Sequence, residues 1–196
     1  MPNLTLPVPE GYNPETSPIV RTTAAQLDAL LATLTRRVEE ATPEQLEWQL
    51  GPGTNTIGML LAHLAVVEVY WVEAVGRGID SDEEADRIVQ GILGIRMEED
   101  GMPLPENGTH PRSLAGKTAA DYLEMLRRAR SATHHALRSW DDRGLAETRT
   151  VDGREVSLAW LLYHLVEHFA YHLGQIAQLA SLRRRIQGTP ANHHPI

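Results

Sequence analysis

Residues 157–182 read SLAWLLYHLVEHFAYHLGQIAQLASL, and apolar side chains recur in this stretch at every third or fourth position. That spacing is the period of one face of an α-helix. The pattern predicts a long helix, capped by Ser157 and ending near Ile186, that packs this face against a hydrophobic core. The apolar face comprises Leu158, Leu161, Leu162, Leu165, Phe169, Ile176 and Leu179.

Three histidines, His164, His168 and His172, recur in this helix at every fourth residue. A helix turns by about 100° per residue, so the three side chains lie along one side of it. The angles place His172 inside the apolar face, His168 beside it and His164 at its edge. Two inward imidazoles one turn apart can offer two nitrogens to one divalent metal ion, whereas a single inward histidine is more often a hydrogen-bonded core residue. Both interpretations remain open at this point.

The composition is that of an ordinary soluble globular protein. Of the 196 residues, 42% are hydrophobic and 22% are charged, which fits one domain, residues 1–196, with a sizeable core. The net charge of −8 disfavours nucleic-acid binding, which relies on basic surface. The chain has no cysteine, so thiolate metal ligands and cysteine nucleophiles are excluded. Any site for a soft metal must therefore be built from histidines and carboxylates.

Both ends of the sequence are expected to be irregular. Residues 1–20 are rich in proline and irregular, with neither a basic segment nor a long apolar run, so we expect no signal peptide. No stretch approaches about 18 uninterrupted apolar residues, so we expect no membrane span and a cytoplasmic location. Residues 187–196 are expected to be a tail, in which His193 and His194 lack a scaffold for binding metal.

Capping residues and apolar periodicity predict the other elements. Asp152-Gly153, flanked by residues 148–151 and 154–156, is a strong hairpin signal. The sum predicts an all-α fold, an up-down four-helix bundle with a long third connection (residues 77–117) and a small β-hairpin before the last helix. The expected helices run from Thr22 or Thr23 to about Glu40, from Thr42 to about Gln49, from Asn55 or Thr56 to about Gly76, from Asp82 to about Leu93, and from Thr118 to about Trp140.

Four other histidines precede the last helix. His63, in the helix of residues 55–76, lies beside the apolar face, so it is either a boundary residue at a helix–helix contact or a third metal ligand. His110 lies in a segment rich in glycine and proline and is expected to be exposed. His134 and His135 fall off the apolar face of their helix, which indicates surface positions.

Residues 55–64 and 168–175, together with the hairpin before the last helix, resemble the DinB-like (YfiT-like) superfamily of metal-binding four-helix bundles. The family pattern has one histidine on the second bundle helix and two ligands four residues apart on the last. The resemblance therefore implies His63, His168 and His172 as metal ligands, with His164 as an alternative ligand or a residue that supports one. It also implies a homodimer.

Three neutral histidines suit Zn or Ni and leave coordination positions open for water or substrate. The resemblance implies a small-molecule enzyme, a thiol S-transferase that uses mycothiol or bacillithiol as cosubstrate. One alternative is a metal-dependent hydrolase with Glu68 or Glu167 as general base, although Glu167 lies about 100° from His168 and is expected to face outward. The other alternative is a metal-stabilised stress or binding protein that is not an enzyme.

Three further residues are candidates for binding a cofactor or substrate. Gln175 lies near His168 on the helix and could hydrogen-bond a metal ligand or a bound water. Tyr70 and Tyr171 are pocket candidates, although aromatic rings near such a core more often serve packing alone. The sequence does not identify a catalytic residue.

Overall fold

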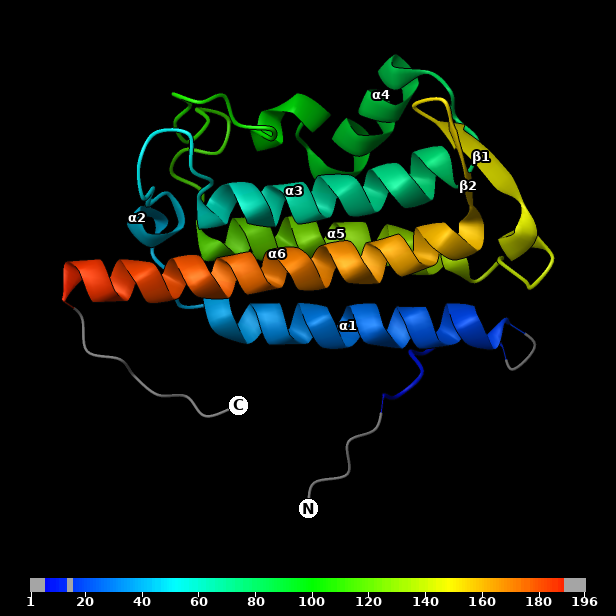
Figure 1. Ribbon diagram of the computed structural model, residues 1–196. Coiled ribbons are helices and arrows are strands. Elements are labelled where there is room, and N and C mark those ends of the chain that lie inside the picture. The colour runs from blue at the N-terminus through cyan, green and yellow to red at the C-terminus, as the bar shows by residue number, and fades with distance from the viewer. Residues whose placement is uncertain (1–5, 14–15, 189–196) are drawn as a thin grey trace.

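The computed structural model describes residues 6–13 and 16–188, and four long helices lie side by side in it (Figure 1). They are α1 (Pro18–Val38), α3 (Ile57–Val69) with its π-helical continuation η1 (Tyr70–Val75), α5 (Ala119–Leu137) and α6 (Leu158–Gln187). The shorter elements are α2 (Pro43–Leu46), α4 (Asp82–Leu93), η2 (Met97–Asp100), η3 (Gly144–Ala146), β1 (Thr148–Val151) and β2 (Arg154–Ser157). The described chain is mainly helical, as predicted, with one small two-stranded sheet.

The long helices pack α3 against α5 and α1 against α6, and α3 also contacts α6. α1 and α6 run in one direction, and α3 and α5 run in the other (Figure 1). The second and third long helices are thus parallel, which departs from the alternating directions of a simple up-down order. The reason is the connection of residues 76–118, whose helix α4 carries the chain back toward the end where α3 began.

Four helices begin close to their predicted starts, each with a capping side chain. The hydroxyl groups of Thr56, Ser81, Thr118 and Ser157 each accept a hydrogen bond from a backbone N–H of the first helical turn. Such caps satisfy N–H groups that have no partner inside the helix. α6 ends at Gln187, close to its predicted end, and His193 and His194 lie outside the described residues.

The start of α1 corrects the prediction that residues 1–20 are irregular. Ser17 accepts a hydrogen bond from the backbone N–H of Ile19, and Pro18 is the first helical residue. Proline suits this position because its φ angle is already helical and its missing N–H would have no helical partner. The helix therefore begins before Thr22, the first of the two predicted caps.

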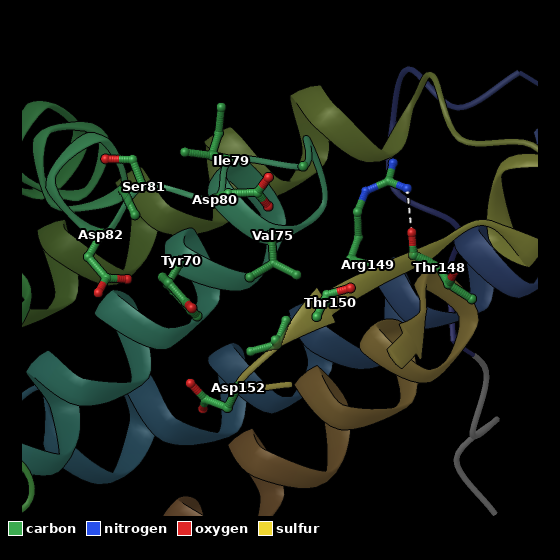
Figure 2. Close-up of a pocket in the computed structure, with 13 residues that line it drawn as sticks. Tyr70, Val75, Ile79, Asp80, Ser81, Asp82, Thr148, Arg149, Thr150 and Asp152 are labelled. Carbon is green, nitrogen blue, oxygen red and sulfur yellow. Dashed lines mark hydrogen bonds between the residues drawn. The ribbon is translucent and has the colours of Figure 1, made fainter. Parts of the chain in front are cut away.

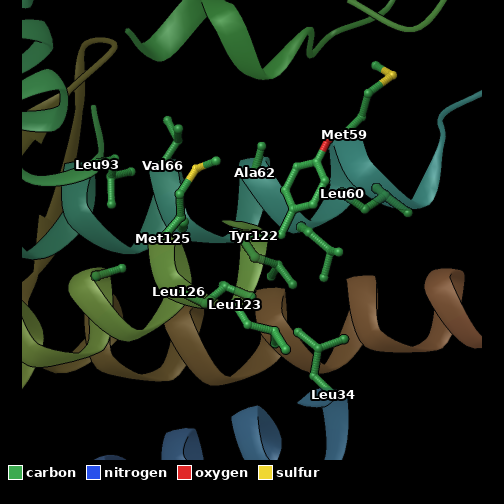
Figure 3. Close-up of a cluster of buried hydrophobic side chains, with 14 of the residues drawn as sticks. Leu34, Met59, Leu60, Ala62, Val66, Leu93, Tyr122, Leu123, Met125 and Leu126 are labelled. Atoms are coloured by element: carbon green, nitrogen blue, oxygen red, sulfur yellow. The ribbon is translucent and has the colours of Figure 1, made fainter. Parts of the chain in front are cut away.

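The main hydrophobic core lies between α3, α5 and α6 and is closed by residues of α1 and α4 (Figure 3). Tyr122 of α5 is fully buried in it and donates a hydrogen bond to the Leu114 carbonyl oxygen over 3.2 Å. A Cβ atom on Gly58 of α3 would lie only 2.6 Å from the Tyr122 hydroxyl oxygen, so this contact requires glycine. Close packing here fixes α3 against α5 and thereby sets the position of His63.

The segment Ile57–Val75, which joins α3 and η1, is long and apolar enough to cross a membrane by composition alone, with a mean hydropathy of 1.5. However, 72% of that window is buried by the rest of the described chain. A helix at the centre of a core needs apolar side chains on every face, so its hydropathy follows from its position.

The predicted hairpin is confirmed. β1 and β2 pair antiparallel, with Thr148 opposite Ser157 and Val151 opposite Arg154. Asp152 and Gly153 have φ angles of 50° and 72°, the left-handed conformations that a tight two-residue turn requires. The hairpin places Ser157 at the start of α6.

Candidate metal centre

His63 of α3 and two histidines of α6, His168 and His172, converge between the two helices. Each ring offers one nitrogen, and these three nitrogens all lie within 4.8 Å of one another. The Nε2 atom of His168 lies 3.2 Å from that of His63 and 3.1 Å from that of His172. At metal–nitrogen distances of about 2.0–2.1 Å, two nitrogens of a tetrahedral site lie about 3.3 Å apart. The spacing of this histidine centre therefore fits one divalent ion.

The outer nitrogens of two of these rings are hydrogen-bonded. His63 Nδ1 lies 2.9 Å from Asp100 Oδ2, and His172 Nδ1 lies 2.7 Å from Gln175 Oε1. Because a carboxylate and an amide oxygen accept hydrogen bonds, both Nδ1 atoms are donors. The Nε2 atoms of His63 and His172 then carry lone pairs that face His168 Nε2, and imidazole nitrogens suit Zn²⁺ or Ni²⁺.

Burial favours the uncharged form of His168 and His172. It lowers the pKa of His168 to about 3, and the neighbouring His172, His63 and His164 lower it further. Burial also lowers the pKa of His172, while the hydrogen bond to Gln175 opposes that shift. A neutral imidazole is the form that binds metal, so these two side chains are in the binding form at neutral pH.

Asp100 is the residue of this centre that sequence reasoning missed. It ends the short helix η2, its side chain is only 4% exposed, and its second oxygen accepts a hydrogen bond from the backbone N–H of Met102 over 2.8 Å. Both oxygens are thus engaged, so the carboxylate holds the His63 ring in a fixed orientation. Asp100 lies far from His63 in the sequence and in an irregular segment, where no periodicity marks it.

His164 stands beside the three histidines rather than among them. Its ring stacks on Trp160 at a centroid distance of 4.9 Å and an interplanar angle of 6°, and it meets Trp71 edge-on at 5.1 Å. The centroid of its ring is 5.5 Å from that of His168. The histidine centre therefore consists of His63, His168 and His172, and His164 borders it.

The two carboxylates considered as general bases lie elsewhere. Glu68 is 3% exposed and accepts two hydrogen bonds from Arg130, over 2.8 and 3.1 Å. Glu167 has a side chain that is 54% exposed, and its carboxylate lies 3.8 Å from His164 Nδ1. Both residues were candidates because they lie close to the histidines in the sequence. In the structure, Glu68 points toward Arg130 and forms an ion pair with it, and Glu167 points toward solvent.

The three candidate binding residues fall in different places. Gln175 contacts the centre through His172, and the Tyr171 ring lies edge-on to His172 at 5.3 Å but is 64% exposed. Tyr70 lines a hollow of about 640 Å³ beside the hairpin, together with Asp82 and Asp152 (Figure 2). None of the three histidines lines that hollow, so Tyr70 faces a different part of the molecule.

Two histidines expected at the surface are instead partly buried. His134 Nε2 lies 3.0 Å from Asp28 of α1, and its Nδ1 lies 3.0 Å from the Tyr12 hydroxyl. The helix angle placed His134 off the core, but α1 and the segment before it cover that side of α5. Likewise, His110 Nδ1 lies 2.8 Å from the hydroxyl of Thr56, the residue that caps α3.

Asp28, Glu68, Arg130 and His134 form one charged network across three helices. Arg130 also donates to Asp28 over 3.0 Å and is 4% exposed. Its positive charge is flanked by the two carboxylates, so the buried charges are paired within the network itself.

Comparison with known proteins defines the class of this chain. Residues 26–176 match the DinB superfamily, and since the match covers most of the chain, the protein belongs to that superfamily. The crystal structure of a DinB-like protein from Bacillus cereus ATCC 10987 is similar in fold, with a TM-score of 0.52 at 19% sequence identity. That similarity covers 89% of this chain and 95% of the other. No match is found among curated proteins.

Proposed function

We propose that the histidine centre binds one divalent cation, Zn²⁺ or Ni²⁺, and that the protein is a metal-dependent S-transferase for a low-molecular-weight thiol of the mycothiol or bacillithiol type. The observation that supports the metal is that the Nε2 atoms of His63 and His172 lie 3.2 and 3.1 Å from that of His168, while Asp100 and Gln175 hydrogen-bond the outer nitrogens of those two rings. We also propose that α1, α3, α5 and α6 are the four helices of a DinB-type bundle, which places this centre between its second and fourth members.

A bound divalent cation would supply Lewis acidity that lowers the pKa of a coordinated thiol. The chain's own residues set the conditions for this. Three neutral imidazoles leave the full positive charge of the ion in place, because none of them brings a negative charge. Asp100 and Gln175 fix the ring orientations of His63 and His172, so the ligands need not reorganise when substrate arrives.

The reaction balances without a redox partner. The thiol loses its proton to solvent, and its sulfur forms a bond to an electrophilic carbon of the second substrate. The leaving group departs with the electrons of the bond that breaks. The protein has to bind and orient both molecules, which alone contributes a large part of the rate enhancement.

Thiol transfer fits the surroundings of the centre better than hydrolysis does. A thiol has a pKa near about 8.5, whereas bulk water has one near about 15.7, so water depends far more on a general base. The three nearby carboxylates have other positions or partners: Glu68 pairs with Arg130, Asp100 holds His63, and Glu167 is 54% exposed. The alternative, a hydrolase, would require a base that these residues do not provide.

The test is conjugation of bromobimane with low-molecular-weight thiols, using protein loaded with Zn²⁺ or Ni²⁺. We expect a rate above the uncatalysed reaction that is lost in His172→Ala and retained in His135→Ala, a matched control at an exposed histidine. Conjugation that never exceeds background with any of several thiols would contradict the proposed transferase. Turnover of esters that is lost in His172→Ala would support the hydrolase instead.

A further inference from the structure

A group of aromatic rings borders the histidine centre on the side of His164. The indole of Trp160 stacks on the His164 imidazole, and the indole of Trp71 meets both rings edge-on, at centroid distances of 5.7 Å to Trp160 and 5.1 Å to His164. His164 is in turn 5.5 Å from the His168 ring. We name Trp71, Trp160 and His164 the aromatic wall, and it lies directly beside a proposed metal ligand.

The backbone of α3 departs from regular geometry where it supplies its part of this wall. Residues Tyr70–Val75 form a π-helix, in which the N–H of Gly76 donates to the Trp71 carbonyl oxygen over 2.8 Å. Such turns are rare and occur frequently at functional sites, because they rotate the side chains that follow. Here the π-helix begins at the residue before Trp71, so it sets the direction in which that indole points.

The wall is also accessible. Trp160 is 41% exposed, although its neighbours Leu161 and Leu162 on the same helix are buried. The His164 side chain is 23% exposed. A large indole is normally covered or used at a binding surface, since its area makes burial favourable. The Glu167 carboxylate lies 3.8 Å from His164 Nδ1, and its negative charge disfavours an anionic ligand beside these rings.

We propose that the aromatic wall is a binding subsite for the planar aromatic or conjugated part of the electrophilic substrate. This inference rests on the proposed thiol transfer and adds the substrate class to it. An uncharged flat group would stack on the face of Trp160 that His164 leaves free, and the reacting carbon would lie on another part of the same molecule, which extends past His164 toward the three histidines. Stacking of this kind selects a flat ring over a saturated ring of similar size.

The test is a fluorescence titration of the full chain with 2,4-dinitroaniline, a neutral flat ring that quenches tryptophan emission and does not react with thiols. We expect saturable quenching that cyclohexanol does not reverse. Trp160→Ala should weaken binding by about tenfold, and Trp160→Phe, which keeps a flat ring, by about threefold or less. Trp48→Phe is the matched control and should bind as the wild type does, because Trp48 follows α2 at the opposite end of the helices (Figure 1).

Equal affinity of the wild type and Trp160→Ala would overturn the subsite. So would sedimentation showing that a second copy of the chain covers Trp160 and that Trp160→Ala changes only the oligomeric state. The titration is run without thiol, on both metal-free and metal-loaded protein. It therefore tests the subsite even if the protein does not catalyse thiol transfer. If transfer is observed, Trp160→Ala should also lower kcat/KM for an iodoacetamide that carries a 2,4-dinitrophenyl group on a flexible linker about tenfold more than for iodoacetamide itself.

Discussion

Two polar clusters lie between the helices of this protein, and they differ in how their groups are satisfied. In the charged network, Arg130 faces Glu68 and Asp28, so the positive and negative groups pair with one another. In the histidine centre, three Nε2 atoms face one another, and the oxygens of Asp100 and Gln175 accept hydrogen bonds from the far sides of two of the rings. The charged network thus contains both the positive and the negative groups of its ion pairs, whereas the nitrogens of the histidine centre suit an added cation.

The comparison shows that burial of polar side chains does not by itself indicate function. Both clusters join α3 to another long helix, and both contain nearly buried ionisable groups. What separates them is the direction of the lone pairs and the sign of the nearest partners. We therefore interpret the charged network as structural and the histidine centre as the candidate functional site. Substitutions in each cluster test this interpretation.

The largest expected effect is on stability, from Arg130→Met. The substitution leaves the Glu68 carboxylate buried without its partner, which costs about 3–5 kcal/mol of unfolding free energy. We expect the metal content of the folded protein to remain that of the wild type. Urea unfolding with metal analysis checks both, and the double variant Glu68→Gln/Arg130→Met should recover part of the loss. Loss of metal in folded Arg130→Met would mean that the two clusters are not separable.

Removal of metal should have the next largest effect. An ion present at about 100 times its Kd stabilises the native state by about 2.7 kcal/mol, so chelation should lower Tm by about 5–10 °C. His168→Ala should abolish the response to chelator, because the middle ligand is gone, and His135→Ala should keep it. A response of the same size in His168→Ala would place the metal elsewhere.

A smaller effect is expected from Asp100→Asn, which weakens the hold on His63 without removing a ligand. Loss of such a supporting carboxylate typically reduces metal affinity by about 10–100-fold. Competition with a chromophoric chelator measures this. Asp28→Asn, which changes the carboxylate bound to His134, is the control and should leave the affinity as it is. Matching affinities for all three proteins would remove Asp100 from the centre.

The smallest expected effect is a pH dependence confined to the charged network. Burial alone would raise the pKa of Asp28, but hydrogen bonds from His134 and Arg130 outweigh it and lower that pKa. A lowered carboxyl pKa stabilises the fold above its unfolded value, near about 3.9, and the contribution is lost as pH falls through the folded value. Unfolding of wild type and Asp28→Asn between pH 6 and acid should therefore differ most at the upper end. A difference independent of pH would contradict the linkage.

Much of the fold could be predicted because its signals are local. Thr56, Ser81, Thr118 and Ser157 cap helices through hydrogen bonds that span only three residues, and Asp152-Gly153 forms its turn from its own backbone preferences. The π-helix after Val69 could not be predicted, because apolar periodicity assumes a regular α-helix. The parallel direction of α3 and α5 also depends on the path of the connection rather than on any single residue.

The candidate site also has parts that the sequence predicts and parts that it does not. Helical spacing brought His168 and His172 to one side of α6, and the resemblance to a family implied His63. Asp100 had no such signal, because its partner lies on another helix and its own segment is irregular. His134 was placed at the surface from the angle within α5 alone, whereas the contacts that bury it come from Tyr12 and Asp28. The sequence thus does not determine which distant residues pair with these polar groups.

The measurement to make first is the metal content of untagged protein by inductively coupled plasma mass spectrometry, with wild type, His63→Ala and His135→Ala side by side. We expect about one divalent ion per chain in the wild type and in His135→Ala, and loss of the ion in His63→Ala. An ion content that is equal in all three proteins, or negligible in the wild type supplied with Zn²⁺ and Ni²⁺, would contradict the assignment of the histidine centre as a metal site.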